Sequence, residues 1–85
     1  MSIREDAKKI IQYMLNIAIS QGDLYEHFFI GYDVLAKELG LENEKYCRIC
    51  CQYLDQLNYI KIIRNDGGLR LIELKAKGIE FLESM

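Results

Sequence analysis

The sequence contains no proline, a single histidine and no long apolar run. Without proline, the breaks between elements must come from glycine, of which the chain has six. No apolar run exceeds four residues, whereas a helix that crosses a bilayer needs about 20, so no membrane span is expected. His27 has no paired carboxylate or nucleophile at a recognisable spacing, and no glycine loop of the phosphate-binding type is present. Neither an enzyme nor a cofactor is therefore expected.

What is present is the composition of one ordinary globular domain. The chain has 85 residues, of which 51% are hydrophobic and 28% charged, so we expect a single domain over residues 1–85. The three cysteines are clustered within 47–51, and no secretion signal is visible. An odd, clustered set argues against a disulfide framework and favours a reducing cytoplasm.

The charge is spread unevenly along the chain. The net charge is −2 at pH 7, unlike the strongly basic balance of many small nucleic-acid binders. Residues 61–77, however, carry five cations against two anions, a net charge of +3. Because salt screens charges beyond about 8–10 Å, local charge decides whether a phosphate backbone is attracted at contact range. This segment is therefore the best electrostatic candidate for a nucleic-acid contact.

The hydrophobic periodicity predicts a mainly helical α+β domain. Apolar residues at helical spacing predict a long N-terminal helix over 3–20, a helix-turn-helix over 32–57 and a last helix over 76–83. A hairpin is predicted over 59–74, because its Asn-Asp-Gly-Gly sequence is typical of a tight turn. With a short extended stretch at 27–30, the hairpin predicts a three-stranded antiparallel sheet that has one very short strand.

Three residues are predicted to set the ends of the middle helices. Gly40 stands at the C-terminal stop of the first, and Asn43 is a good N-cap for the second. Asn58 then ends the second helix, because asparagine is the next choice after glycine for the left-handed conformation at such a stop.

The sequence resembles the winged helix-turn-helix superfamily in three stretches, which are residues 35–41, 54–60 and 74–82. The first resembles that family's opening helix and turn, the second its exit from the recognition helix into the wing, and the third its C-terminal end. The chain departs from the family pattern at Asn58, where most members have glycine, and at Lys75, where a threonine usually caps the last helix. The resemblance covers about residues 28–82 and implies the winged-helix fold.

Winged-helix proteins mostly bind duplex DNA and regulate transcription, commonly as homodimers, and a sizeable minority bind only proteins. The resemblance implies a DNA-binding regulator that places the helix over 43–57 in the major groove and the wing on the phosphate backbone. The alternative is a protein-interaction module that does not bind DNA. Such a module would use a stripe formed by Tyr46, Ile49 and Tyr53.

The candidate DNA-binding residues are Lys45, Tyr46, Arg48, Gln52 and Gln56 on the helix over 43–57, and Arg64 and Arg70 on the wing. Arginine pairs with guanine and glutamine with adenine in the major groove, whereas wing cations displace counterions from phosphates. Two ordinary interpretations remain open. The helix face could be simply solvated, and cations on edge strands also keep those strands from pairing with other chains.

The inward face of the same helix is predicted to consist of Cys47, Cys50, Cys51, Leu54 and Leu57. Free cysteine is among the most buried residue types, so core packing is expected. A metal site is not expected, because zinc normally takes four ligands and nothing in the spacing of His27 supplies the fourth.

The first helix carries more apolar surface than a one-sided helix needs. Its apolar arc spans roughly 240°, whereas a surface helix needs a stripe only a little over about 100° wide. We therefore expect a homodimer whose interface includes Ile11, Leu15 and Ile19. The alternative is that the phenylalanines and the last helix cover this face and leave a monomer.

Overall fold

The computed structural model describes residues 2–25, 27–28, 31–64 and 70–84, and it shows a mainly helical α+β domain. The elements in chain order are α1 (Ile3–Gln21), β1 (His27–Phe28), α2 (Tyr32–Leu39), α3 (Glu44–Gln56), β2 (Ile60–Arg64), β3 (Arg70–Leu74) and α4 (Ala76–Glu83). The predicted turn at the hairpin tip lies outside the described residues. No helix within the described ranges is long and apolar enough to span a membrane.

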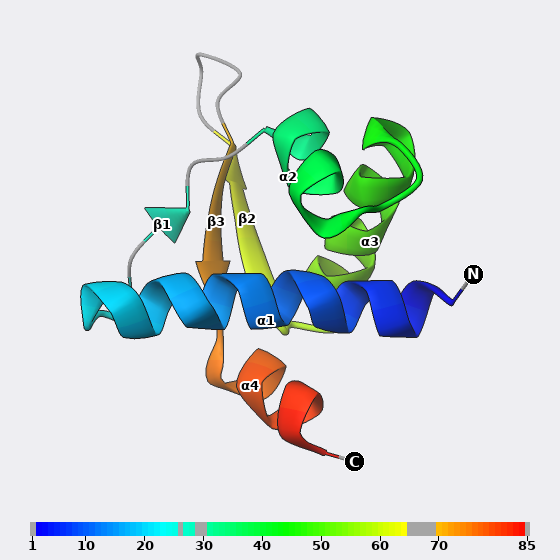
Figure 1. Ribbon diagram of the computed structural model, residues 1–85. Helices are drawn as coiled ribbons and strands as arrows, with labels where there is room; N and C mark the ends of the chain where they lie inside the picture. The colour runs from blue at the N-terminus through cyan, green and yellow to red at the C-terminus, as the bar shows by residue number, and fades with distance from the viewer. Residues whose placement is uncertain (1, 26, 29–30, 65–69, 85) are drawn as a thin grey trace.

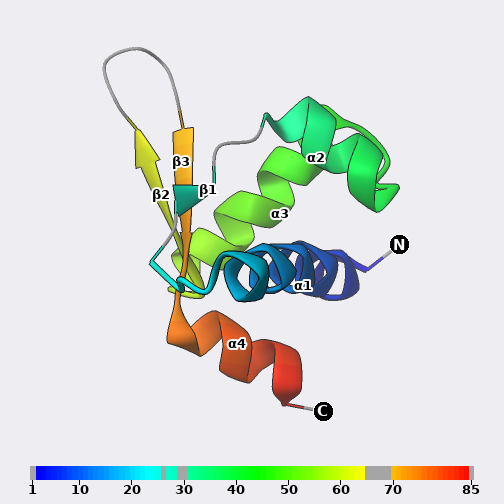
Figure 2. The same ribbon diagram turned by 60° about the vertical axis from the view of Figure 1, so that its left-hand side comes forward.

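Helix α1 crosses the middle of the molecule, with α3 and the sheet on one side and α4 on the other (Figures 1 and 2). Ser2 caps its start by accepting a hydrogen bond of 3.4 Å from the backbone N–H of Glu5. Gly22 ends it in the left-handed conformation, with φ 69°. Contact on two sides explains why α1 has such a wide apolar arc.

The predicted ends of α2 and α3 are confirmed. Gly40 is left-handed, with φ 67°. The Asn43 side chain accepts a hydrogen bond of 2.8 Å from the backbone N–H of Tyr46, as expected of an N-cap. Asn58 has φ 63° and is the one non-glycine residue with a positive φ in the described part of the chain. These local signals fix how α3 leaves the turn and enters β2.

The sheet is an antiparallel β2–β3 pair with the two-residue β1 along the other edge of β3. The β2–β3 register runs from Ile60 opposite Leu74 to Arg64 opposite Arg70. The paired region falls within the range predicted for the hairpin, 59–74. One face of the pair is buried against the helices, where Ile60, Ile72 and Leu74 join the core.

The core confirms four of the five residues predicted on the inward face of α3. Cys47, Cys50, Cys51 and Leu54 have no exposed surface. Leu57 is the exception, with 38% of its surface exposed. The prediction was wrong because α3 ends at Gln56, so Leu57 is the capping residue and lies beyond the last helical turn that packs on the core.

Helix α4 covers the second apolar side of α1. The Phe81 ring stacks on Tyr59 with a centroid separation of 4.6 Å. The charged groups of Arg4 and Lys8, on α1, lie 5.1 Å and 5.5 Å from the centroid of the Phe81 ring. As expected from its sequence, Lys75 supplies no side-chain cap to α4.

Gly78 lets α4 approach α1 closely, and this corrects one predicted dimer contact. A Cβ at Gly78 would collide with the backbone carbonyl oxygen of Tyr59 and would lie 3.2 Å from Cδ1 of Ile11. Ile11 is consequently fully buried inside the chain. A residue with no exposed surface cannot contact a second molecule, so its assignment to a dimer interface was wrong.

Candidate nucleic-acid interface

Helix α3 presents a narrow outer face opposite its buried cysteines. The residues on it are Lys45, Ile49, Gln52 and Gln56, which at 100° per residue lie within an arc of about 60°. Lys45 and Gln56 are exposed, Gln52 is half-buried, and Ile49 keeps 51% of its surface exposed. We call these four residues the outer face. It comprises three polar side chains that can form hydrogen bonds and one apolar side chain.

The polar groups of the outer face have no partner in the part of the chain that the structure describes. Among the described residues, the Lys45 ammonium and the amides of Gln52 and Gln56 have neither a hydrogen bond nor an ion pair. Together the two amides and the ammonium offer donors, and the amides also offer acceptors. The face can therefore bind a polar ligand without breaking an internal contact.

Arg48 does not belong to the outer face but lies on the flank of α3 that faces α2. Its guanidinium carbon lies 5.6 Å from the centroid of the Tyr32 ring. Its Nη2 is 3.7 Å from Oε1 of Glu44, one turn earlier on α3. Its Nε is buried and has no hydrogen-bond partner. The Arg48 guanidinium therefore lies beside α2, where Glu44 offsets part of its charge, and its predicted contact with DNA stays a prediction.

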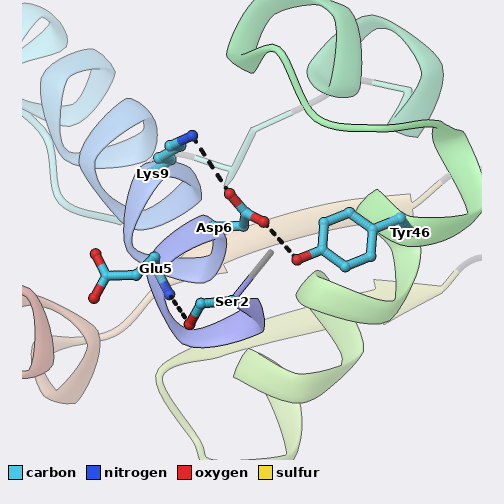
Figure 3. Close-up of polar contacts among 5 residues, drawn as sticks. All are labelled: Ser2, Glu5, Asp6, Lys9 and Tyr46. Carbon is cyan, nitrogen blue, oxygen red and sulfur yellow. Dashed lines mark hydrogen bonds and ion pairs between the residues drawn. The ribbon is translucent and has the colours of Figure 1, made fainter.

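Tyr46 lies on the opposite flank and faces α1, which corrects its predicted place on the exposed surface. Its hydroxyl donates a hydrogen bond to Oδ2 of Asp6, and Nζ of Lys9 lies 3.4 Å from Oδ1 of the same carboxylate (Figure 3). One 100° step along the helix turns Tyr46 away from Lys45 and towards α1. Of the predicted stripe, this leaves Ile49 and the half-buried Tyr53.

The Asp6–Tyr46 contact perturbs both groups. The hydrogen bond from Tyr46 lowers the pKa of Asp6, and Lys9 lowers it further. The pKa of Tyr46 is raised, first by the hydrogen bond to Asp6 and then by burial, because a phenolate would face the carboxylate at close range. Near neutral pH, Asp6 is therefore an ionised acceptor and Tyr46 is a neutral donor.

A shallow hollow of about 220 Å³ runs along the edge of the outer face. It is lined by Ile3, Ile49, Gln52, Tyr53 and Gln56. Ile3 comes from the first turn of α1, 46 residues before Ile49. The sequence pattern gave no signal for this neighbour, because periodicity indicates the direction of a side chain and not the element that packs beside it.

The two arginines that the sequence predicted on a wing end the β2–β3 ladder. Arg64 is directly opposite Arg70 in the register. The side chains of both residues lie outside the described part of the structure, as do residues 65–69 between them.

The cysteine cluster lies on the other side of α3, inside the core. A hydrogen bond with Cys47, followed by burial, raises the pKa of the Cys51 thiol. In the parts of the chain that the structure describes, no group of three or more His, Cys, Asp or Glu residues could hold a metal ion.

Compared with protein-family models, with curated proteins and with solved structures, the chain has no significant match in any of the three.

Proposed function

We propose that the protein is a winged-helix DNA-binding regulator, rather than an enzyme, with α3 as the recognition helix and the β2–β3 hairpin as the wing. The observation that carries the proposal is the outer face, where Lys45, Gln52 and Gln56 share one exposed side of α3 and have no partner among the described residues. Amide and ammonium groups are suited to base edges and phosphates in the major groove. The element order agrees with the superfamily that the sequence resembles.

The register of the wing supports a contact with phosphate. Like charges at directly opposite positions destabilise an antiparallel pair, and Arg64 and Arg70 occupy such positions. An anion at this end of the ladder would offset that destabilisation. The hairpin over 59–74 also carries three cations, Lys61, Arg64 and Arg70, against Asp66 and Glu73. The two arginines are therefore proposed to contact the DNA backbone, where they would release counterions.

The hollow favours one alternative, a protein-interaction module without DNA binding. Ile3, Ile49 and Tyr53 give it apolar walls, and an apolar side chain of a partner protein would fit there. This alternative predicts no binding to duplex DNA, whereas the first predicts binding that weakens steeply with salt.

A homodimer is part of the proposal, now with a smaller interface than the sequence predicted. Ile19 keeps 69% of its surface exposed, and Tyr25, just beyond the end of α1, keeps 77%. Leu15 is half-buried on the same side of α1 as Ile19. Two-fold pairing would suit a protein that reads two half-sites about one helical turn apart. A reducing cytoplasm is proposed as its location, since the three cysteines are free thiols.

Fluorescence anisotropy with a labelled random-sequence duplex, repeated across a salt series, tests the proposal. We expect binding at low salt whose logarithm falls linearly with the logarithm of salt concentration. Lys45→Ala should reduce that slope by about one unit. The matched control is Lys77→Ala, which removes an exposed cation from α4 on the far side of α1. Absence of binding at low salt, or equal effects of the two variants, would reject DNA binding by α3.

A further inference from the structure

We propose that the outer face selects A·T base pairs, with Gln52 and Gln56 reading adenine and Ile49 contacting the methyl group of thymine. This inference rests on the proposed function, because it concerns the bases that α3 meets once the protein is on duplex DNA. Three observations carry it. They are the chemistry of the two amides, the exposure of Ile49, and the position of the single arginine of α3.

The two amides match adenine better than guanine. In the major groove adenine offers an N7 acceptor beside an N6 donor, and a glutamine amide can donate to the first while it accepts from the second. Guanine offers two acceptors there, so the amide oxygen would face an acceptor and stay unpaired. Gln52 and Gln56 are separated by four residues, a rise of about 6 Å along the helix. Their amides can therefore reach different bases, since successive bases on a strand rise by about 3.4 Å.

Ile49 supplies the one apolar group on the outer face. Thymine is the base that presents an apolar group, its C5 methyl, in the major groove. Ile49 lies one helical turn from both Lys45 and Gln52 and shares the hollow with Ile3 and Tyr53. A methyl group entering between these side chains would leave water and meet apolar atoms on several sides.

The arginine that could read guanine lies off the outer face. Arginine or lysine on guanine O6 and N7 is the commonest specific contact in the major groove, so Arg48 and Lys45 are the two side chains of α3 that could read guanine. Arg48 is the single arginine of α3, and its guanidinium lies over Tyr32 and beside Glu44, off the outer face. Lys45 remains in the first turn of α3, seven residues before Gln52, and we assign it to a phosphate. This division leaves the base contacts to two amides and an isoleucine.

The test uses the full chain and begins with selection of bound duplexes from a random library, followed by affinity measurements on the selected site. Two probes change one recognition atom or group each. Deoxyuridine in place of thymidine removes the C5 methyl, and 7-deazaadenine in place of adenine removes the N7 acceptor. We expect selected sites rich in A·T pairs at the centre of each half-site. Each deoxyuridine at a contacted position should weaken binding by about fourfold, the loss expected for one buried methyl.

Single variants then assign the contacts to residues. Ile49→Ala should bind the thymidine and deoxyuridine duplexes equally. Gln52→Ala and Gln56→Ala should each lose the response to 7-deazaadenine at one position and should discriminate adenine from guanine there by at least about fivefold less than the wild type. Lys77→Ala is the control and should keep both responses. All four side chains are at least partly exposed, so we expect the four variants to fold. Thermal melts equal to that of the wild type would check this.

The outcomes separate this inference from the proposed function. Salt-dependent binding with G·C-rich selected sites, or with no response to either probe, would overturn the A·T assignment and leave DNA binding intact. A probe response that persists in Ile49→Ala or in both glutamine variants would also overturn it. Failure to bind any duplex at low salt would reject both, and the hollow would then favour a protein partner.

Discussion

The Tyr46 hydroxyl, on α3, donates a hydrogen bond to the carboxylate of Asp6, on α1, forty residues away along the chain (Figure 3). The contact ties the first turn of α3 to the first two turns of α1. It also sets the rotation of α3 about its own axis, because Tyr46 cannot face α1 unless Lys45, Gln52 and Gln56 face outward. One pair of side chains therefore helps to orient the proposed DNA-reading surface.

Removing this hydroxyl should destabilise the protein. We expect Tyr46→Phe to lower the free energy of unfolding by about 1–2 kcal/mol, because the Asp6 carboxylate loses a donor in a partly buried site. The control is Tyr13→Phe, since the hydroxyl of the half-buried Tyr13 has no hydrogen bond among the described residues. Urea denaturation of both variants gives the comparison. Equal losses would show that the Asp6–Tyr46 bond does not stabilise the fold.

The same pair predicts how stability depends on acid. The pKa of Asp6 is lower in the folded chain than its ordinary value of 3.8, so folding favours the ionised carboxylate. This stabilisation is fully present above the ordinary pKa and is lost as the pH falls below it towards the folded pKa. As the pH is lowered from 5 to the point at which the protein unfolds, the free energy of unfolding of Asp6→Asn should therefore fall less than that of the wild type. Parallel pH profiles from denaturant melts would contradict the linkage.

Gly78 should not tolerate a side chain. We expect Gly78→Ala to destabilise the protein by about 1–3 kcal/mol, the usual cost of overpacking, because the new Cβ would collide with the Tyr59 carbonyl. Alanine is the better helix former, so propensity alone predicts the opposite sign. Lys77→Ala, an exposed position of the same helix, should be close to neutral. A stabilised Gly78→Ala would mean that α4 does not approach Tyr59 so closely.

The buried thiols should resist polar replacement. Cys51→Ser is expected to destabilise the protein by about 1–3 kcal/mol, since it buries a hydroxyl where the core is closed. Ile49→Ala, on the outer face of the same helix, should cost much less because half of Ile49 is already exposed. Thermal melts compare the two. An unchanged Cys51→Ser would indicate that this face of α3 is accessible and would revive a metal or redox role.

The dimer proposal now gives opposite expectations for Ile19 and Ile11, which the sequence analysis placed in the same interface. Ile19→Glu should yield a folded monomer in sedimentation experiments, because this side chain is exposed. Ile11→Glu should unfold the chain, because it would place a charge in the core. A wild-type protein that is monomeric at tens of micromolar concentration would reject the dimer. A dimer unaffected by Ile19→Glu would move the interface elsewhere.

Features set by neighbouring residues could be predicted from the sequence. The ends of α2 and α3 at Gly40, Asn43 and Asn58 depend on backbone preference and on a side chain that bonds within its own turn. The burial of the three cysteines followed from helical spacing, because the opposite side of α3 is polar.

Features set by distant residues could not be predicted. Periodicity showed that Ile11 is on an apolar side of α1 but left open whether the last helix or a second molecule covers it, since the contact with α4 depends on the absence of a side chain at Gly78. Tyr46 was expected at the surface. Its partner, Asp6, precedes it by forty residues, and periodicity within one helix does not indicate such a contact. The position of Arg48 over Tyr32 could not be predicted for the same reason.

The position of α1 between α3 and α4 has a consequence for how the chain is made. Helix α1 leaves the ribosome before α4, which covers Ile11 and stacks Phe81 beneath Arg4 and Lys8. At about 5–20 residues per second, α1 waits several seconds with one apolar side bare. The nascent chain therefore passes through a stage in which α1 can bind a chaperone, and tertiary folding is completed only after the segment over 76–83 has been synthesised.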